Sequence, residues 1–277
     1  MTVRFRADKH KYESTNPEDN IDWISVTSFL SNFKTPFDAV AQSKKSAKNP
    51  RSKWYGMTPE QIQEAWAAEA DRAVNLGTWY HNQRESDLVS HDTIERQGVS
   101  IPIIKPIIDG DLKLAPDQRL TEGIYPEHFV YLKSAGICGQ ADRIEVVKDV
   151  VSVYDYKTNK KIEKESFKNW EGVSKKMIGP CAHLDDCNFN HYSLQLSIYL
   201  YIILKHNPRY KPGKLELQHV MFESKENDKY GNPVVIKNAE GEPIVKEIVY
   251  YELPYLKNEV RNMFTWLSEN RDKLIKK

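Results

Sequence analysis

Two apolar stretches near the centre of the chain predict a β-hairpin that carries charge. Residues 136–147 and 150–157 are built mostly from Val, Ile and Tyr, and the two residues between them predict a tight turn. Asp142, Asp155 and Lys157 nevertheless lie within these strands. Because a strand packed inside a sheet normally excludes unpaired charge, these three residues need partners or a function.

The spacing of the three charged residues predicts that they lie close together. Side chains alternate along a strand, so Asp155 and Lys157 point to the same face, and a turn between the strands places Asp142 roughly opposite Asp155. Two carboxylates this close repel each other unless one pKa rises or a metal binds. Oxygen ligands suit Mg²⁺ or Mn²⁺, and a neighbouring lysine can orient a water that attacks phosphorus. The alternative is an incidental Asp-x-Lys on a surface hairpin, which Gly139 and the apolar stretch 150–154 make less attractive.

The composition is that of one folded, globular domain. The chain has 277 residues, of which 40% are hydrophobic, 29% are charged and 30 are aromatic, enough to bury a sizeable core. No apolar run reaches the roughly 18–20 residues that span a bilayer, and the N-terminus has no apolar secretory segment. We therefore expect a cytoplasmic protein without membrane association.

The three cysteines do not form a disulfide framework. Cys138, Cys181 and Cys187 are irregularly spaced and odd in number, which fits a reducing compartment. Cys181, His183 and Cys187 resemble metal ligands, but no second ligand pair stands at zinc-finger spacing, so a structural zinc site is not favoured.

Helix and strand signals alternate along the rest of the chain. Thr58, Pro59 and Gln61 form a capping box that begins a helix running to residue 90, with Gly77 as a possible break. The other expected elements are a short helix capped by Ser25 or Thr27, a loop with short extended pieces at 99–126, strands at 127–134 and 215–222, mixed helix and loop at 158–190, a buried helix at 191–206, a hairpin within 223–251 and an amphipathic helix at 256–274. This order predicts one α/β domain over residues 1–277 with a central mixed sheet, divided into an N-terminal helical part (1–98), a catalytic core (99–222) and a C-terminal hairpin and helix (223–277).

Basic residues gather in two segments although the net charge is only +1. Residues 39–59 contain five basic residues and no acid, and residues 157–176 contain seven lysines against three glutamates. Each segment alone is most simply a solvated surface. Two such segments around a candidate site favour a polyanionic partner.

Three motifs occur in the order expected for one family. Gly139-x-x-Asp142 is followed, thirteen residues after Asp142, by Asp155-Tyr156-Lys157-Thr158. Gly77-Thr78-x-x-His81-x-x-x-Glu85 precedes them, and Gln195-x-x-x-Tyr199 follows. Over residues 77–199 the chain therefore resembles the PD-(D/E)XK nuclease superfamily, specifically its RecB-like branch, which includes phage-encoded exonucleases and the mitochondrial genome maintenance exonuclease.

The resemblance implies a fold and a set of site residues. The fold is a restriction-endonuclease-like α/β core whose central mixed β-sheet is flanked by helices. The implied catalytic residues are Asp142, Asp155 and Lys157; the implied ligands of Mg²⁺ or Mn²⁺ are His81, Asp142, Asp155 and the Tyr156 carbonyl; Glu85 and Glu122 are neighbours of the metal site; and Gln195, Tyr199, Thr158, Lys160 and Lys161 contact DNA.

The resemblance also implies an activity. It favours a metal-dependent DNA exonuclease that acts on single-stranded ends, in DNA repair or recombination, with Trp54 or Trp79 available to stack on bases. The alternatives are a structure-specific or restriction-type endonuclease and a catalytically inactive nucleic-acid-binding protein. No iron–sulfur cluster is expected, because three cysteines cannot supply the four ligands used in some relatives. No P-loop is present, so no helicase motor is expected, and protein partners stay unknown.

Overall fold

A six-stranded mixed sheet forms the centre of the molecule. The computed structural model describes the chain except residues 1–2, 7–10, 20, 111, 115–116 and 275–277. The strand order is β14-β11-β10-β9-β3, and β8 also pairs with β9. The bounds are β3 Ile24–Ser25, β8 Gly123–Leu132, β9 Ile137–Val147, β10 Val150–Lys157, β11 Lys211–Phe222 and β14 Val245–Leu253. The pairs β10–β11 and β3–β9 are parallel and the others antiparallel, which confirms the predicted α/β fold with a mixed sheet.

The edges of β9 are used unevenly. β8 pairs along one edge of β9 from Ile137 to Val146. A strand has two edges, so β3 and β10 share the other, β3 at Ile137–Cys138 and β10 from Arg143 onward. Between these two pairings, at residues 139–142, no strand of the described chain pairs with this edge of β9.

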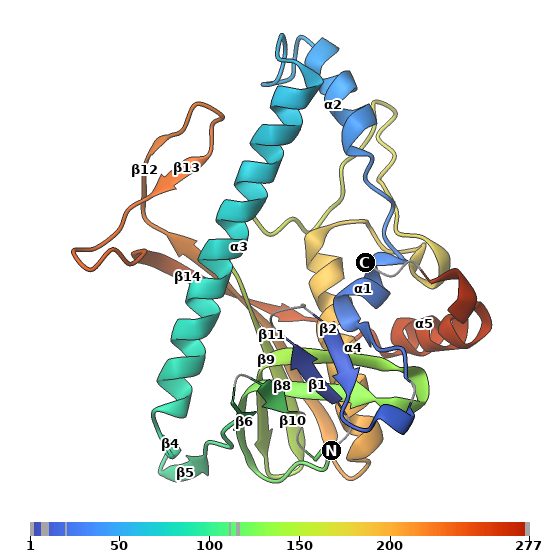
Figure 1. Ribbon diagram of the computed structural model, residues 1–277, viewed down its shortest axis with the longest axis vertical. Helices are drawn as coiled ribbons and strands as arrows, with labels where there is room; N and C mark the ends of the chain where they lie inside the picture. The colour runs from blue at the N-terminus through green and yellow to red at the C-terminus, as the bar shows by residue number, and fades with distance from the viewer. Residues whose placement is uncertain (1–2, 7–10, 20, 111, 115–116, 275–277) are drawn as a thin grey trace.

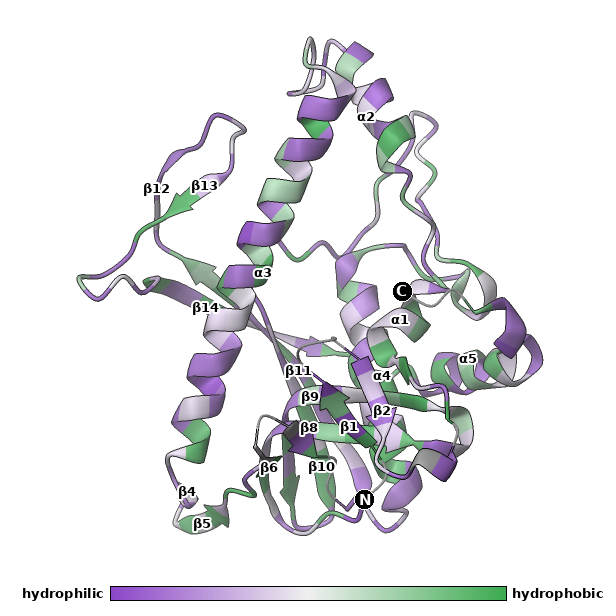
Figure 2. Cartoon of the chain, viewed as in Figure 1, coloured by the Kyte–Doolittle hydropathy of each residue, from purple (hydrophilic) through white to green (hydrophobic). Residues whose placement is uncertain are grey.

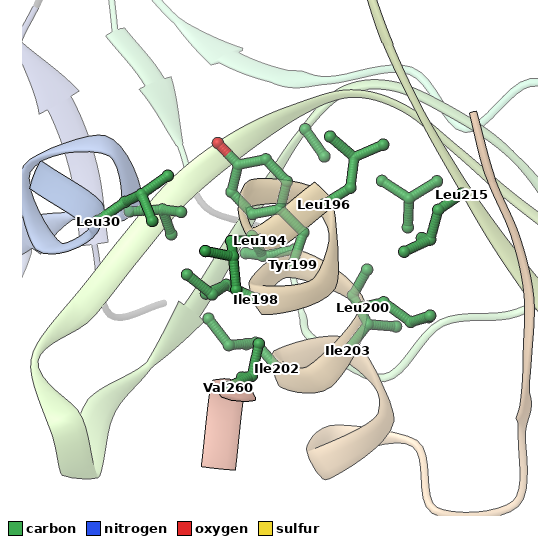
Figure 3. Close-up of a cluster of buried hydrophobic side chains, with 14 of the residues drawn as sticks. Leu30, Leu194, Leu196, Ile198, Tyr199, Leu200, Ile202, Ile203, Leu215 and Val260 are labelled. Atoms are coloured by element: carbon green, nitrogen blue, oxygen red, sulfur yellow. The ribbon is translucent and has the colours of Figure 1, made fainter. Parts of the chain in front are cut away.

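Helix α4 (Asn188–His206) is the buried helix predicted at 191–206. Its buried side chains include Leu194, Leu196, Ile198, Leu200 and Ile202, and they pack against the sheet, α1 (Val26–Ser31) and α5 (Lys257–Asn270) in one core cluster (Figure 3). Burial of each such side chain contributes about 1.5–3 kcal/mol to folding. This helix therefore anchors one face of the sheet.

Helix α3 (Pro59–Val89) is a single 31-residue helix. Thr58 and Gln61 form the predicted capping box, but the helix runs through Gly77 without a break. A Cβ at Gly77 would lie 3.4 Å from Thr158 Oγ1, an ordinary contact distance, so α3 passes close to the residue that follows β10. Farther along, Tyr80 packs against Tyr156 on the face of the sheet opposite α4.

The N-terminal half of α3 rises above the sheet together with α2 (Ala39–Lys48) (Figure 1). Gln63 Nε2 donates to Ser43 Oγ at 3.0 Å, and the Phe37 and Trp66 rings lie 5.6 Å apart, so the two helices are joined by side-chain contacts. In Figure 2, hydrophilic residues recur along the whole of α3, as expected for a helix that leaves the core.

Short strands surround this framework. Four of them form a second sheet in the order β2-β1-β7-β6, which was not predicted; β6 and β7 lie within residues 99–126, where a loop with short extended pieces was expected. The remaining elements are β1 Val3–Arg6, β2 Lys11–Ser14, β4 Thr93–Arg96, β5 Val99–Pro102, β6 Ile107–Asp109, β7 Leu112–Leu114, β12 Ser224–Asn227, β13 Pro233–Val235, and the 3₁₀ helices η1 Pro17–Asp19, η2 Lys133–Ala135, η3 Gly179–Cys181 and η4 Arg271–Lys273. None of the described helices is long and apolar enough to cross a membrane.

Candidate active site

Three neighbouring strands each place one carboxylate at the same level of the sheet. The β8–β9 ladder pairs Pro126 with Arg143 and His128 with Ala141, so Glu127 lies across from Asp142. The β9–β10 ladder ends at the pair Arg143–Tyr154, so Asp155 is the next residue of β10 beside Asp142. The predicted proximity of Asp142 and Asp155 therefore follows from the register, and β8 adds a third acid.

Strand β10 separates from β9 directly after Tyr154. The main-chain N–H of Tyr156 donates to Asp142 Oδ2 at 2.6 Å instead of to a carbonyl of β9. The carbonyl oxygen of Tyr156 lies 3.1 Å from His81 Nε2. The sheet thus opens into a fork at this point, with Asp142 on one branch and residues 155–157 on the other.

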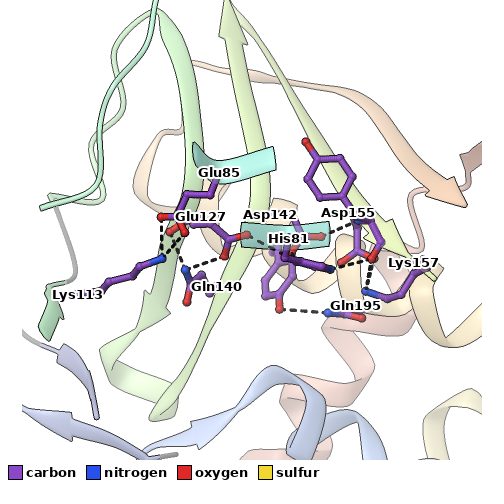
Figure 4. A network of polar contacts seen from close by, with 11 residues as sticks. His81, Glu85, Lys113, Glu127, Gln140, Asp142, Asp155, Lys157 and Gln195 are labelled. Carbon is purple, nitrogen blue, oxygen red and sulfur yellow. Dashed lines mark hydrogen bonds and ion pairs between the residues drawn. The ribbon is translucent and has the colours of Figure 1, made fainter. Parts of the chain in front are cut away.

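His81 reaches this fork from α3 (Figure 4). Its Nδ1 lies 3.4 Å from Asp142 Oδ1 and 3.6 Å from Glu127 Oε1. Burial lowers the pKa of His81, but the charge of Asp142 and the hydrogen bonds to Asp142 and Glu127 outweigh it and raise that pKa to about 11. The two carboxylates therefore surround a positive charge.

Glu127 is a site residue that the sequence analysis did not identify. Its backbone is left-handed, with φ at 46°, which is strained for a residue other than glycine and turns the side chain toward the fork. Gln140 Nε2 donates to Glu127 Oε2 at 2.8 Å and holds it in place. Burial, with the charge of Asp142, raises the pKa of Glu127 to about 7. The signal was available: with a turn near residue 135, residue 127 falls opposite residue 142.

Glu122 and Glu85 were predicted as neighbours of the metal site, and the structure does not bring Glu122 there. Glu122 Oε1 accepts the main-chain N–H of Lys148 at 3.1 Å, in the turn after β9. Six residues of strand separate that turn from Asp142, roughly 20 Å. Glu85 lies one helical turn beyond His81, where Lys113 Nζ donates to both of its carboxylate oxygens at 2.7 Å (Figure 4).

Asp155 and Lys157 share one face, as the alternation predicts. Lys157 Nζ forms an ion pair with Asp155 Oδ2 and lies 3.4 Å from the Tyr156 carbonyl oxygen. Burial, opposed by Lys157, raises the pKa of Asp155 to about 6. Burial also lowers the pKa of Lys157, but Asp155 and Asp142 outweigh this and raise it, so the ammonium stays charged.

These groups fit a hard divalent cation. His81, Glu127 and Asp142 have ligand atoms within 4.8 Å of one another. Asp155 Oδ2 is buried and its partner in the described part of the chain is the Lys157 ammonium, so a cation bound here would share this carboxylate with Lys157. Carboxylate oxygens with one imidazole suit Mg²⁺ or Mn²⁺.

Helix α4 closes the face below the fork. Gln195 Nε2 donates to the Tyr199 hydroxyl at 3.3 Å, and Lys157 Nζ lies 5.1 Å from the centre of the Tyr192 ring. Tyr199 is buried, and a Cβ at Gly139 would lie 2.7 Å from Tyr199 Cε1. Gly139 therefore makes room for Tyr199, and Tyr199 supports β9 from beneath.

The residues that follow β10 mostly contact the protein itself. Thr158 packs beside Gly77. Lys160 Nζ lies 2.7 Å from both Glu69 Oε1 and Asn232 Oδ1, and so links α3 to the turn between β12 and β13. Lys161 is exposed and pairs with Glu163 at 2.8 Å.

The two basic segments differ in the structure. In residues 157–176, ion pairs at 2.6–2.9 Å neutralise Lys168, Lys175 and Lys176. The other segment has exposed cations on α2 and in the loop after it, and none of them forms an ion pair with the described part of the chain: Lys44, Lys45, Lys48 and Arg51. In the described chain, the segment around α2 therefore has more cations without an acidic partner than residues 157–176 have.

Trp54 and Trp79 are both partly buried by other aromatic rings. The Trp54 ring lies 6.3 Å from Trp66 and 6.2 Å from Tyr230, and the Trp79 ring lies 6.1 Å from Phe222. These contacts hold both side chains against the protein, so neither is a free stacking surface.

The cysteine-rich stretch offers no cluster of ligands. Cys181 and Cys187 are buried free thiols, and His183 Nε2 lies 3.1 Å from Glu259 Oε1. In the described ranges of the chain, the acid and histidine group at His81 is the one with metal-ligand spacing.

Comparisons with known proteins agree with this geometry. A family profile described as "PD-(D/E)XK nuclease superfamily" matches residues 35–276. No curated protein sequence matches the chain. A solved structure described as "Crystal structure of SSO0001" aligns with 91% of this chain and 76% of its own, at 15% identity and a TM-score of 0.33.

Proposed function

Because the chain belongs to the PD-(D/E)XK nuclease superfamily, a family of metal-dependent nucleases, we propose that it is a Mg²⁺- or Mn²⁺-dependent DNA exonuclease acting on single-stranded ends. The observation that carries the proposal is the fork between β9 and β10, where three acids, His81 and Lys157 converge. The preference for a single strand and for ends rests on the resemblance over residues 77–199.

The acids and His81 would hold the metal. Glu127, Asp142 and Asp155 supply carboxylate oxygens, His81 supplies an imidazole nitrogen, and the Tyr156 carbonyl lies beside them. The metal, when bound, supplies charge neutralisation at the phosphate and a more acidic water. Asp142 is itself held by the N–H of Tyr156, so the ligands are in place before substrate arrives.

Lys157 would position the attacking water. Its ammonium is held by Asp155 and keeps its proton at neutral pH, so it acts as a hydrogen-bond donor rather than as a base. A charged donor here can orient the water and stabilise negative charge that develops on a phosphate oxygen. When the water attacks phosphorus, the phosphorus–oxygen bond to the leaving sugar would break; the water would lose its proton to solvent and the leaving oxygen would take one from solvent.

The exposed cations of α2 would contact the DNA backbone. Lys44, Lys45 and Lys48 have no ion-pair partner in the described chain, so phosphates can pair with them without first displacing a carboxylate. Gln195, which lies beside Lys157 in Figure 4, and Lys161, four residues after Lys157, would contact the nucleotides around the scissile phosphate.

The test is degradation of single strands labelled at the 5′ or 3′ end, with Mg²⁺ or Mn²⁺. We expect degradation by the wild type and a loss of roughly 10²–10³-fold with Lys157→Ala, while DNA binding is retained. Asp155→Ala with unchanged degradation would exclude this site as the nuclease centre.

A circular single strand separates the two nuclease hypotheses. An obligate exonuclease leaves the closed circle intact and degrades the same strand once it is linearised. Cleavage of the circle at the rate of the linear strand would replace the proposal with an endonuclease.

A further inference from the structure

The two most exposed large hydrophobic side chains of the described chain stand on one short hairpin. Trp170 is 91% exposed and Phe167 is 79% exposed. Single exposed hydrophobic residues are ordinary, but neighbouring ones on a projecting tip mark a contact surface. The candidate site described above uses neither residue.

This hairpin is held in a fixed conformation. The main-chain N–H of Asn169 donates to Val173 O at 3.0 Å, and that of Lys175 donates to Phe167 O at 3.0 Å. The side-chain oxygen of Asn169 also accepts the N–H groups of Glu171 and Val173, at 3.0 and 2.9 Å. The two aromatic rings are therefore presented on an ordered turn, which lowers the entropic cost of binding a ligand.

Two aspartates anchor the base of the hairpin. Asp185 Oδ2 accepts the N–H of Ser166 at 3.2 Å and Asp185 Oδ1 pairs with Lys176, while Asp186 Oδ2 pairs with Lys175 at 2.9 Å. The N–H of Asp186 also donates to Lys175 O at 2.9 Å. These contacts explain why the lysines at the base are not free, and they fix the tip relative to α4, which begins two residues later.

The hairpin belongs to the segment that joins both sides of the candidate site. It begins ten residues after Lys157, and the same segment leads into α4, which carries Gln195. In Figure 1 this segment rises toward the part of the molecule that carries α2, whose lysines have no acidic partner in the described chain. Thr35, four residues before α2, donates its Oγ1 to Lys176 O at 3.1 Å, so the base of the hairpin contacts the segment that leads into α2. Aromatic rings together with free cations are the combination that binds single-stranded nucleic acid.

We propose that Trp170 and Phe167 form a stacking platform for unpaired bases of the strand that this site cuts, so the inference rests on the proposed function. Every base presents a π face, so such a platform holds a strand without sequence preference. A protein partner fits less well, because a stable interface buries roughly 800 Å² per partner and this tip offers two rings beside the charged Lys168 and Glu171.

The test measures binding of a fluorescent single-stranded oligonucleotide without divalent metal. The variants are Trp170→Ala, Phe167→Ala, Trp170→Phe and, as a matched control, Tyr250→Ala, which removes an aromatic residue that is 60% exposed on β14. We expect Trp170→Ala to bind roughly tenfold more weakly, Trp170→Phe to retain most of the affinity, and the control to match the wild type. Thermal unfolding should not change, because the substituted side chains are exposed.

An abasic oligonucleotide of the same length shows whether the loss comes from stacking. We expect Trp170→Ala and the wild type to bind it equally. Equal affinity of both proteins for the normal oligonucleotide, or an equal loss on both oligonucleotides, would overturn the platform while leaving nuclease activity intact. A wild-type protein that neither binds nor degrades DNA would instead overturn the proposed function, and is seen directly in the wild-type measurements.

Discussion

At the scale of single residues, two glutamates of one heptapeptide have opposite surroundings. Glu122 and Glu127 both belong to "TEGIYPE", and either could be the acid that precedes Asp142. Strand register separates them, because Glu127 lies across from Asp142 and Glu122 reaches the turn at Lys148. Strand alternation predicted that Asp142, Asp155 and Lys157 lie close together, and the family resemblance added His81, but a backbone φ of 46° at Glu127 is not visible in a sequence.

Substitution of the two glutamates gives a matched pair. We expect Glu127→Gln to weaken Mn²⁺ binding by at least 10–100-fold, because one charged oxygen ligand is lost, and to lower degradation with it. Glu122→Gln should leave both unchanged. Titration calorimetry with Mn²⁺ measures the affinity, and a larger loss from Glu122→Gln would contradict the assignment.

Metal affinity should rise with pH across the neutral range. Before metal binds, the pKa of His81 is raised to about 11, so its ring is protonated at neutral pH, and only the neutral ring can bind a cation. Burial also raises the pKa of Glu127 to about 7, so below that pH a second proton must leave. Each released proton makes the affinity up to about tenfold stronger per pH unit.

The measurement is the Mn²⁺ affinity at pH 6.5, 7.5 and 8.5. His81→Asn should bind more weakly at every pH and show a shallower slope, because one of the released protons is gone. An affinity that does not depend on pH would show that His81 does not exchange its proton for the metal.

At the scale of elements, two motif glycines have different physical roles. The sequence marked Gly77 as a possible helix break and placed Gly139 in the motif with Asp142. The structure shows that Gly77 lies within a continuous helix and that Gly139 faces the buried Tyr199. Helix caps and strand alternation were predictable because they are local. The contacts of the two glycines were not, because their neighbours Thr158 and Tyr199 are distant in sequence.

Alanine at each glycine tests this difference. Gly77→Ala should raise the free energy of unfolding by up to about 1 kcal/mol, because alanine favours the helix and its Cβ meets Thr158 at an ordinary contact distance. Gly139→Ala should lower it by roughly 1–3 kcal/mol, because the Cβ would overlap the Tyr199 ring. Urea unfolding measures both, and a stabilised Gly139→Ala would contradict the packing argument.

At the scale of the whole molecule, ion pairs decide which segment carries free positive charge, and the number of lysines in a segment does not. The lysine-rich stretch 157–176 suggested a DNA surface, but Asp185 and Asp186 lie outside that window and neutralise its last lysines. In the basic segment around α2, Lys44, Lys45, Lys48 and Arg51 form no ion pair within the described chain. The α/β fold was predictable from the order of elements, while the location of free charge required the tertiary structure.

The two basic segments should respond differently to neutralisation. Replacing Lys44, Lys45 and Lys48 with glutamine should weaken binding of single-stranded DNA and reduce the slope of log affinity against log salt by about 2. Replacing Lys175 and Lys176 should change that slope little, because their charges are already paired. A salt titration of oligonucleotide binding compares the two variants, and equal slopes would contradict the assignment.

The separation of β10 from β9 has a consequence for how this site could be copied. Asp142 stands in for a peptide carbonyl, because its side chain takes the N–H of Tyr156 that a completed ladder would have consumed. Strand β3 occupies the edge of β9 at Ile137–Cys138, and β11 pairs with β10. These contacts prevent β9 and β10 from pairing along their full length. In a peptide of residues 136–157 alone, β9 and β10 could pair along their full length. The arrangement of the site would then be lost, although the peptide still contains Asp142, Asp155 and Lys157. The site therefore depends on incomplete pairing between β9 and β10, and the surrounding strands maintain that incomplete pairing.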